Sequence, residues 1–344
     1  MVNVVRVGYE AANSYVKVKT VVGEDSYLNT LTMVHHSYSA DVIGKDSPDA
    51  TTKKKKTIYT VNGINYFVGE SDGTQTADRD ENRYKNPAFI TASLIAIARN
   101  VNNGDHVMAV TALPSAHHDM TEIHKYLRET LMKEHTVYID GIPKTFRIVQ
   151  LGVELQPVMA ALPAIFDIHG NIRDMKLLQA KKVVTDIGWG TTDVALIKGS
   201  ELVMSVPVNH SMMNVYKIIR DLLVANHKDK LLGRNIPLFL LEQQLKNAND
   251  EGKYIFKFGG NEFDCTEYTK QAKEAVAFNI MSEIGGSGII LREQDVAIFG
   301  GGGTTSLTEN LASHLQGVNA FKADNPQMTI AYGCYIKSLS LTIA

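Results

Sequence analysis

The chain has 344 residues, 44% of them hydrophobic and 21% charged, which is enough apolar surface for about two domains with full cores. Its 35 lysine and arginine residues nearly balance its 37 aspartate and glutamate residues, which excludes the strongly basic profile of a protein that coats nucleic acid. The cysteines Cys265 and Cys334 lack metal-ligand spacing, no stretch resembles a signal peptide or a membrane helix, and we expect a cytoplasmic protein.

The first half of the chain is predicted to combine strands with two helices. Runs of β-branched and aromatic residues between turn residues indicate strands, and Asn62-Gly63 is the strongest hairpin signal. In chain order we expect strands at 3–9 and 16–22, a polar loop at 39–56, a hairpin at 57–70, a helix at 90–101, a strand at 106–114, a helix at 119–134 and a strand at 146–157.

A similar order of elements begins again near residue 181. We expect a helix at 158–168, a strand at 181–188, a hairpin at 191–208, a helix at 211–226, mixed helices with a hairpin at 253–265, a strand at 295–299 and a closing segment at 325–342. Strands that alternate with helices in this way predict two α/β domains of related topology, with a boundary near residues 165–180.

An internal repeat supports this division. Residues 7–19 and 185–196 both place an acid at the end of a strand, small residues two and four positions later, and then a second strand. The alignment matches Glu10 with Asp186, Ala12 with Gly188, Ser14 with Gly190 and Lys17 with Asp193. We interpret the two segments as copies of one strand–turn–strand unit.

The second copy has the composition of a phosphate-binding turn. Gly188 and Gly190 allow a tight turn whose backbone N–H groups point into a concavity, and Thr191 and Thr192 add hydroxyl groups. Asp186 at its mouth can hold Mg²⁺ through water, because Mg²⁺ keeps most of its hydration shell. The alternative is an ordinary hairpin with glycines. The turn is neither a dinucleotide fingerprint nor a P-loop, since it opens no helix and lacks the lysine motif.

A second glycine-rich segment follows the predicted strand at 295–299. Gly300 to Gly303 form a flat backbone surface for a base or a phosphate, and Thr304, Thr305 and Ser306 are candidates to cap the next helix. The alternative is a flexible loop, although glycine loses much entropy when it is ordered.

Together these motifs resemble the actin, heat-shock chaperone and sugar-kinase superfamily of ATPases, in five segments that span the chain. Gln156-Pro157 resembles the start of the first connecting helix, and residues 330–333 resemble part of the second. The short length favours a bacterial or archaeal actin over the sugar kinases and chaperones. The strand end at Thr111–Pro114, Gln156-Pro157 and the overall spacing favour actins of the plasmid-segregation (ParM/StbA) type over cell-shape actins. The resemblance implies an α/β fold of two ribonuclease H-like domains with a nucleotide cleft between them. Domain I would span 1–168 with 331–344 returning to it, and domain II would span 169–330.

The resemblance also implies roles for individual residues. Asp186 would order the water shell of Mg²⁺, Gln156 would orient the attacking water, and Glu10 would be the acid of the first turn. The implied nucleotide-binding residues are Ala12, Asn13, Ser14, Lys17, Gly188, Trp189, Gly190, Thr191, Thr192, Glu242, Lys246, Gly301, Gly302, Gly303 and Thr304. Trp189 either packs against the nucleotide or supports the hairpin.

The first turn departs from the pattern of this superfamily. Glu10 replaces the usual aspartate, and Ala12 and Ser14 replace the usual glycines. The longer carboxylate must sit differently, and the two side chains restrict the backbone. Either the turn binds phosphate with altered geometry, or hydrolysis is slow.

The function implied is an ATPase, using ATP or GTP with Mg²⁺, that polymerises and segregates plasmid DNA. The chain would bind further copies of itself and an adaptor on a centromere-like DNA site, without direct sequence-specific DNA binding or membrane binding. The alternatives are a monomeric small-molecule kinase and a filament scaffold with little hydrolysis. His35-His36, His117-His118 and Lys53–Lys56 are interpreted as solvated loop residues.

Overall fold

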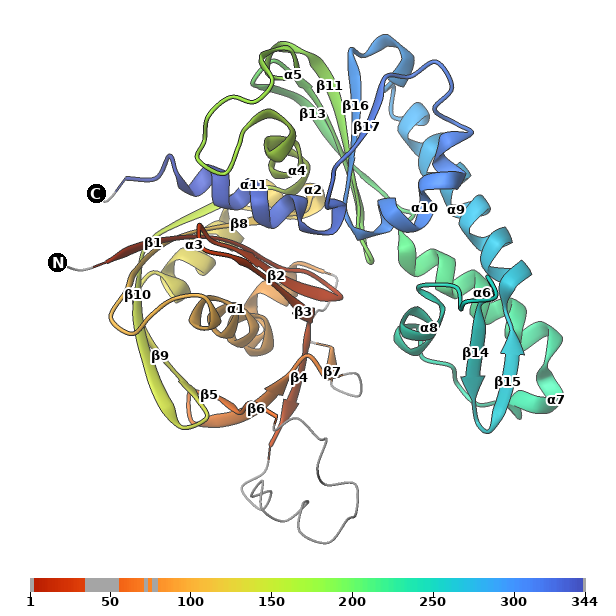
Figure 1. The fold of residues 1–344 in the computed structure, drawn as a ribbon, viewed down its shortest axis with the longest axis horizontal. Coiled ribbons are helices and arrows are strands. Elements are labelled where there is room, and N and C mark those ends of the chain that lie inside the picture. The colour runs from red at the N-terminus through yellow and green to blue at the C-terminus, as the bar shows by residue number, and fades with distance from the viewer. Residues whose placement is uncertain (1–2, 35–55, 71–73, 76–79, 343–344) are drawn as a thin grey trace, which may run out of the picture.

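The computed structural model describes residues 3–34, 56–70, 74–75 and 80–342, and Figure 1 shows how they fold around two sheets. The elements of the first half are β1 (Val4–Ala11), β2 (Tyr15–Lys19), β3 (Glu24–Leu28), β4 (Thr30–Met33), β5 (Tyr59–Val61), β6 (Ile64–Val68), β7 (Thr74–Gln75), the 3₁₀ helix η1 (Glu81–Lys85), α1 (Pro87–Arg99), β8 (His106–Leu113), α2 (Ser115–His118), α3 (Thr121–Leu131), β9 (Glu134–Ile139) and β10 (Ile142–Leu155).

The second half begins with the helix that follows β10. Its elements are α4 (Gln156–Ile165), α5 (Met175–Gln179), β11 (Lys181–Ile187), β12 (Thr192–Lys198), β13 (Glu201–Val208), α6 (Met212–Asn226), α7 (Lys228–Leu231), α8 (Leu238–Leu245), β14 (Ile255–Phe258), β15 (Asn261–Asp264), α9 (Thr266–Gly286), η2 (Leu291–Glu293), β16 (Val296–Gly300), α10 (Gly302–Ala312), β17 (Ala320–Lys322), η3 (Pro326–Met328) and α11 (Thr329–Ser338).

The two large sheets share one topology. The order β3-β2-β1-β8-β10 in the first sheet is matched by β13-β12-β11-β16-β17 in the second, and the first sheet continues through β9, β5, β6, β4 and β7. In the first sheet β2 is antiparallel to β1, and β1, β8 and β10 are parallel. In the second sheet β12 is antiparallel to β11, and β11, β16 and β17 are parallel. The predicted α/β fold of two ribonuclease H-like domains is therefore confirmed.

The register of the two leading hairpins confirms the internal repeat. Glu10 pairs with Lys17 across β1 and β2, and Asp186 pairs with Asp193 across β11 and β12. The residues matched in the sequence alignment therefore occupy equivalent positions in the two sheets. Each acid lies at the end of a strand that runs parallel to its neighbour, where ligands of open α/β sheets bind.

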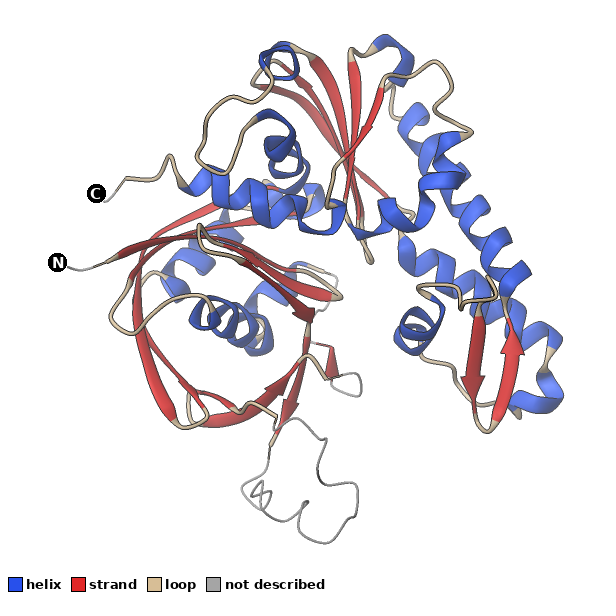
Figure 2. Cartoon of the chain, in the orientation of Figure 1, coloured by secondary structure: helices blue, strands red, loops and turns tan. Residues whose placement is uncertain are grey.

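Burial explains why the sequences of several helices and strands are continuously apolar. The first sheet curves around α1 (Figure 2), so residues 91–98 of this helix are buried on every side. β8 and β16 are also buried over almost their whole length. They are central strands, and helices cover both faces of a parallel sheet. Asn86 begins α1 by accepting a hydrogen bond from the Ala88 amide, and Pro87 follows it where the missing N–H costs nothing.

Two helices connect the sheets, and each packs on the sheet of the other half. α4 follows β10 yet contacts β11, β12 and β16, whereas α11 follows β17 and contacts β1, β2 and β8. The two helices also contact each other, and together with residues of β8, β11, β12 and β16 they form a third hydrophobic core. A Cβ atom on Gly333 would lie 1.9 Å from the carbonyl oxygen of Met159, so the crossing is in backbone contact.

Some predicted boundaries are wrong. The strand predicted at 16–22 ends at Lys19, and a turn leads into β3, which the sequence analysis missed. The helix predicted at 119–134 ends at Leu131, because Glu134 already belongs to β9, which pairs with β10. The strand predicted at 146–157 ends at Leu155, and Gln156 and Pro157 begin α4, as the family resemblance implied, since proline is favoured in the first turn of a helix.

We predict that Gly333→Ala lowers the free energy of unfolding by about 1–3 kcal/mol, because the new methyl group must push α4 away from α11. Urea denaturation followed by circular dichroism measures the change. Gly285→Ala is the matched control: no heavy atom lies within 4 Å of the added Cβ, and we expect a gain of about 0.4–1 kcal/mol. Equal effects of the two substitutions would contradict the close crossing.

Candidate nucleotide site

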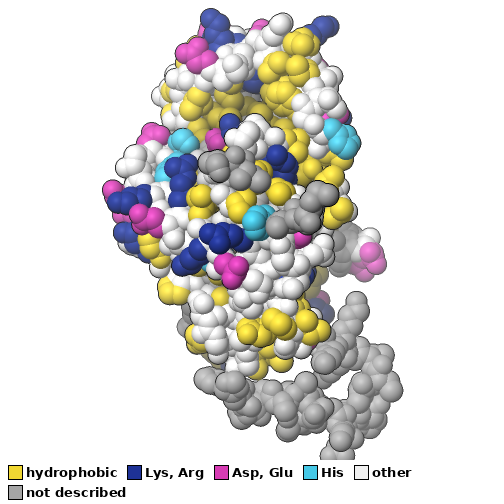
Figure 3. All heavy atoms as spheres, turned by 90° about the vertical axis from the view of Figure 1, so that its left-hand side faces the viewer, with side chains coloured by type: hydrophobic (Ala, Val, Ile, Leu, Met, Phe, Trp, Pro, Cys, Tyr) yellow, Lys and Arg dark blue, Asp and Glu magenta, His cyan; other side chains and the backbone are white. Residues whose placement is uncertain are grey.

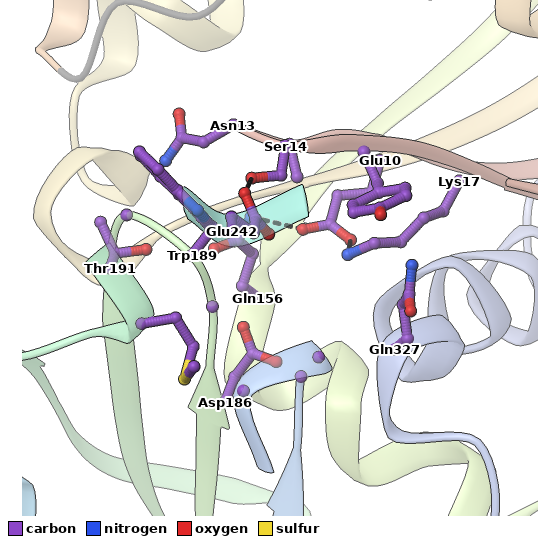
Figure 4. A pocket seen from close by; sticks show the side chains of 18 of the residues that line it. Glu10, Asn13, Ser14, Lys17, Gln156, Asp186, Trp189, Thr191, Glu242 and Gln327 are labelled. Atoms are coloured by element: carbon purple, nitrogen blue, oxygen red, sulfur yellow. Dashed lines mark hydrogen bonds and ion pairs between the residues drawn. The ribbon is translucent and has the colours of Figure 1, made fainter. Parts of the chain in front are cut away.

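A pocket of about 820 Å³, including its part open to solvent, lies between the two domains (Figure 4). The turns after β1 and β11 form two of its walls, and the glycine run after β16 forms a third. The pocket therefore lies where the sequence analysis places the nucleotide cleft.

Glu10 is held by two neighbours at the inner end of the first turn. Its side chain is buried, Lys17 Nζ donates to its Oε2 at 2.8 Å, and Gln156 Nε2 donates to its Oε1 at 3.3 Å. Figure 4 shows the three side chains converging from β1, β2 and the start of α4. A glutamate at this position thus joins a cation and an amide, and both of its oxygens are occupied.

Asp186 is the acid of the second turn, and one of its carboxylate oxygens accepts no hydrogen bond from the described residues. It is 4% exposed, and its buried Oδ1 has no hydrogen-bond partner in the part of the chain that the structure describes. Burial, with a further contribution from the nearby Glu10 charge, raises the pKa of Asp186 to about 8. A buried carboxylate oxygen without a donor fits a bound cation or its water shell, as predicted for Mg²⁺.

Asp193, the partner of Asp186 in the hairpin, ties the two domains together. Its Oδ1 accepts a hydrogen bond from the Ser115 amide at 2.6 Å, and Ser115 Oγ lies 2.6 Å from Ser205 Oγ. Burial raises the pKa of Asp193 as well. Within the described residues, no three His, Cys, Asp or Glu side chains gather as a metal centre, so a cation here would need water or phosphate ligands.

The two turns also approach each other directly. A Cβ atom on Gly190 would lie 2.2 Å from Asn13 Nδ2, so only glycine fits there without displacing Asn13. Ser14 Oγ donates to Glu242 of α8 at 3.4 Å, and Lys246 Nζ donates to the Tyr15 hydroxyl at the same distance. Residues of the first turn therefore contact both the second turn and the end of α8.

Glu242 and Trp189 lie together at the side of the pocket. Burial raises the pKa of Glu242 to about 7, although Lys246 and hydrogen bonds from Ser14 and Trp189 lower it. Trp189 is partly buried against the core of the second domain and also lines the pocket. Trp189 therefore packs on the second domain and lines the pocket, and its contact with a nucleotide stays a prediction.

Gly301 shows why the strand after residue 295 ends in glycines. It has a φ of 81°, and a Cβ atom would lie 2.3 Å from the Ile187 carbonyl oxygen and 2.7 Å from Asp186 Oδ1. Gly301 is the N-cap and α10 begins at Gly302, so the expected caps Thr304, Thr305 and Ser306 lie inside the helix. The three hydroxyl side chains suggested that the helix begins after them, but Gly302 and Gly303 already form the first turn of α10.

Most of the predicted nucleotide-site residues line the pocket: Glu10, Ala12, Asn13, Ser14, Lys17, Gln156, Asp186, Gly188, Trp189, Gly190, Thr191, Glu242, Lys246, Gly301, Gly302 and Gly303. Thr192 and Thr304 do not. Both are buried, and Thr304 donates its hydroxyl to the Gly300 carbonyl. The pocket is also lined by residues that were not predicted to belong to it: Tyr15, Arg83, Pro114, Met212, Tyr216, Ser306 and Gln327.

The histidine and lysine interpretations are partly wrong. His117 is buried, with Nδ1 3.1 Å from the Tyr84 hydroxyl, and burial lowers its pKa. His118 contacts Asp119 and lies partly exposed, as expected. Lys56 pairs with Glu70, whereas Lys53–Lys55 and His35-His36 lie outside the described residues.

Comparisons with known proteins agree with this architecture. Residues 184–313 match the family described as archaeal actin homologue MreB-like, C-terminal, and no curated protein matches the chain. The apo ParM of pSK41 superposes with a TM-score of 0.70 at 19% identity, over 98% of this chain and 97% of that chain. The archaeal actin homologue Ta0583 in complex with ADP gives 0.71 at 18% identity, over 97% and 98%.

A 15-stranded ParM filament from Clostridium botulinum gives a TM-score of 0.71 at 20% identity, over 98% of this chain and 99% of that chain. At such identities the likeness concerns the fold. The chain has the actin-like fold over its length.

We predict that Asp186→Asn raises the melting temperature of the nucleotide-free protein by about 2–4 °C at pH 8.5. The raised pKa means that the folded state keeps a proton that the unfolded state releases above pH about 4, so the native aspartate costs stability increasingly up to pH about 8. The gain from asparagine should therefore be small at pH 5 and largest at pH 8.5, in differential scanning fluorimetry.

Asp264→Asn is the control for this prediction. Hydrogen bonds from Thr266 lower the pKa of Asp264, so its charged form is stabilised and its removal should lower the melting temperature. If Asp186→Asn also lowers the melting temperature at pH 8.5, the buried, partnerless carboxylate is not a source of instability.

Proposed function

We propose that this chain is a cytoplasmic ATPase that polymerises with nucleotide and moves plasmid DNA through an adaptor on a centromere-like site. The observation that carries the proposal is the pair of matched turns, one from each domain, that place Glu10 and Asp186 at one pocket. Two domains that share a ligand change their relative position when it is bound or altered, which suits nucleotide-controlled assembly.

The pocket residues fit a nucleotide with Mg²⁺. The partnerless Oδ1 of Asp186 accepts from the water shell of the cation, and Mg²⁺ supplies positive charge against the phosphates. Backbone N–H groups of residues 13–14 and 189–191 bind phosphate oxygens, whereas those of Ala12 and Gly188 donate to carbonyls within their own turns. Gly301 to Gly303 give the base a flat surface. Glu242 and Lys246 reach the ribose or the base, whether the purine is adenine or guanine.

Gln156 is proposed to orient the attacking water. Its amide nitrogen donates to Glu10, which leaves the amide oxygen to accept a hydrogen bond from water. This also gives a reason for glutamate in the first turn: its longer side chain reaches Lys17 and Gln156 together. Glu10 acts through Gln156, and Asp186 is the acid that serves the cation.

Self-association is proposed from the structural neighbours. These neighbours include a ParM filament from Clostridium botulinum, an Alp12 filament and a non-polymerisable ParM mutant. Contact with DNA is proposed to be indirect, and on the face in Figure 3 basic and acidic side chains are interspersed. In the described ranges, no helix is both long and apolar enough to cross a bilayer. We also propose domain boundaries at 1–168 with 331–344, and at 169–330.

A filament scaffold with little hydrolysis is the second candidate. It is favoured by the carboxylate of Glu10, because each of its oxygens already accepts a hydrogen bond, from Lys17 and from Gln156. A small-molecule kinase is less well supported, because a kinase needs a base for the substrate hydroxyl and Gln156 is an amide.

We predict that wild-type protein pellets with Mg-ATP and releases phosphate, and that it does not pellet without nucleotide. Gln156→Ala should lower the rate of phosphate release about 100-fold while pelleting persists, because the water loses its orienting group and the phosphate contacts remain. Sedimentation and a phosphate-release assay measure both. Gln179→Ala, at an exposed position on α5, is the matched control.

The outcomes separate the candidates. No pelleting with Mg-ATP, Mg-ADP or Mg-GTP over a wide range of protein concentrations rejects the filament proposal. Pelleting of the wild type with negligible phosphate release supports the scaffold. An unchanged rate in Gln156→Ala rejects the role of that residue.

We predict that nucleotide changes the intrinsic fluorescence of the protein, because Trp189 is its only tryptophan and lines the pocket. A titration with Mg-ATP should give a saturable change, which Mg²⁺ alone should not. The Trp189→Phe variant, with binding checked by calorimetry, shows whether the signal arises there. Saturable calorimetric binding without any change in emission would place the nucleotide away from Trp189.

A further inference from the structure

Arg83 is a buried cation of the pocket that the proposed mechanism does not use. It comes from η1, is 6% exposed and lines the pocket. Burying a charge is costly unless a partner compensates it. Any part of this guanidinium that the protein leaves without a partner therefore indicates a contact with a ligand.

The protein supplies only part of what Arg83 can bind. Its Nη1 donates to Asn13 Oδ1 at 2.9 Å and its Nη2 donates to the Ala11 carbonyl at 2.8 Å, whereas its buried Nε has no hydrogen-bond partner among the described residues. The rings of Tyr84 and Phe89 each lie 5.4 Å from the guanidinium carbon, a cation–π arrangement. In the part of the chain that the structure describes, no carboxylate lies within ion-pair distance.

The other two pocket cations differ from Arg83. Lys17 is neutralised by Glu10, with Nζ 2.8 Å from the carboxylate. Lys246 is exposed and lies over the Tyr15 ring. Of these three cations, Arg83 alone is both buried and without a counter-ion in the described ranges. An anionic ligand would compensate its charge.

The position of Arg83 identifies which part of an anion it meets. It binds the side chain of Asn13, and Asn13 lies so close to Gly190 that the two phosphate turns meet there. A phosphate held by both turns would lie beside this junction. An arginine with free N–H groups suits it, because the planar fork matches two phosphate oxygens.

We propose that Arg83 binds the terminal phosphate of a nucleoside triphosphate and makes the pocket prefer triphosphate to diphosphate. This inference rests on the proposed nucleotide function and adds a residue that discriminates between the two states of the nucleotide. It also links the occupied pocket to η1, which precedes α1 in the core of the first domain.

The test is calorimetric binding of the Mg²⁺ complexes of adenylyl imidodiphosphate and of ADP to the full chain. Arg83→Gln should weaken binding of the triphosphate analogue about 10- to 100-fold, the range of a charged hydrogen bond, and binding of ADP less than about threefold. Arg83→Lys keeps the charge but loses the planar guanidinium fork, so its loss of affinity for the triphosphate analogue should be intermediate. Arg99→Gln, which removes an ion pair with Asp25, should leave the ratio of the two affinities unchanged.

Each outcome decides the proposal. A selective loss for the triphosphate supports it. Equal losses for both ligands overturn it, because they show that Arg83 only holds Asn13 in place. If Arg83→Gln does not fold, as judged by circular dichroism, the ratio measured for Arg83→Lys decides, and an unchanged ratio overturns the proposal. Absence of any binding by the wild type rejects the proposed function itself, and this inference with it.

Discussion

Helices α4 and α11 touch backbone to backbone at Gly333, and the geometry of the whole site depends on that contact. Each helix follows the last strand of one domain and packs on the sheet of the other, so the crossing sets the distance between the two sheets. Gly8 has the same role where β1 meets α11, since a Cβ atom there would lie 2.1 Å from the Tyr335 amide. Because interiors are close-packed, a displacement at the crossing must move the turns that carry Glu10 and Asp186.

The charges in the pocket oppose the stability of the fold. Asp186 is buried without a donor for Oδ1, Arg83 is buried without a counter-ion in the described residues, and Glu242 has a raised pKa. Such groups are retained where a ligand compensates them, and they cluster at functional sites. The Glu10–Lys17 pair is the exception, because it is satisfied within the protein and in turn holds Gln156.

The parts of the site that could be predicted from sequence are those whose partners are close in sequence. Glu10 and Lys17 are seven residues apart and meet through one hairpin, and the repeat at Asp186 and Asp193 is visible by alignment. Thr304 was assigned to the site through the family resemblance, but its hydroxyl donates to the Gly300 carbonyl. Arg83 left no local signal, because η1 reaches the pocket only through the packing of the first domain.

Local patterns of residues were enough to predict the two α/β halves, their repeat and the turns that end in an acid, because hairpins and apolar runs follow from backbone geometry. Which side chains complete the pocket depends on tertiary packing. The exchange of α4 and α11 brings the two turns together, and the contacts of Glu10 with Gln156 and of Ser14 with Glu242 span 146 and 228 residues. Contacts of such sequence separation depend on how the sheets pack, and no pattern within one segment encodes them.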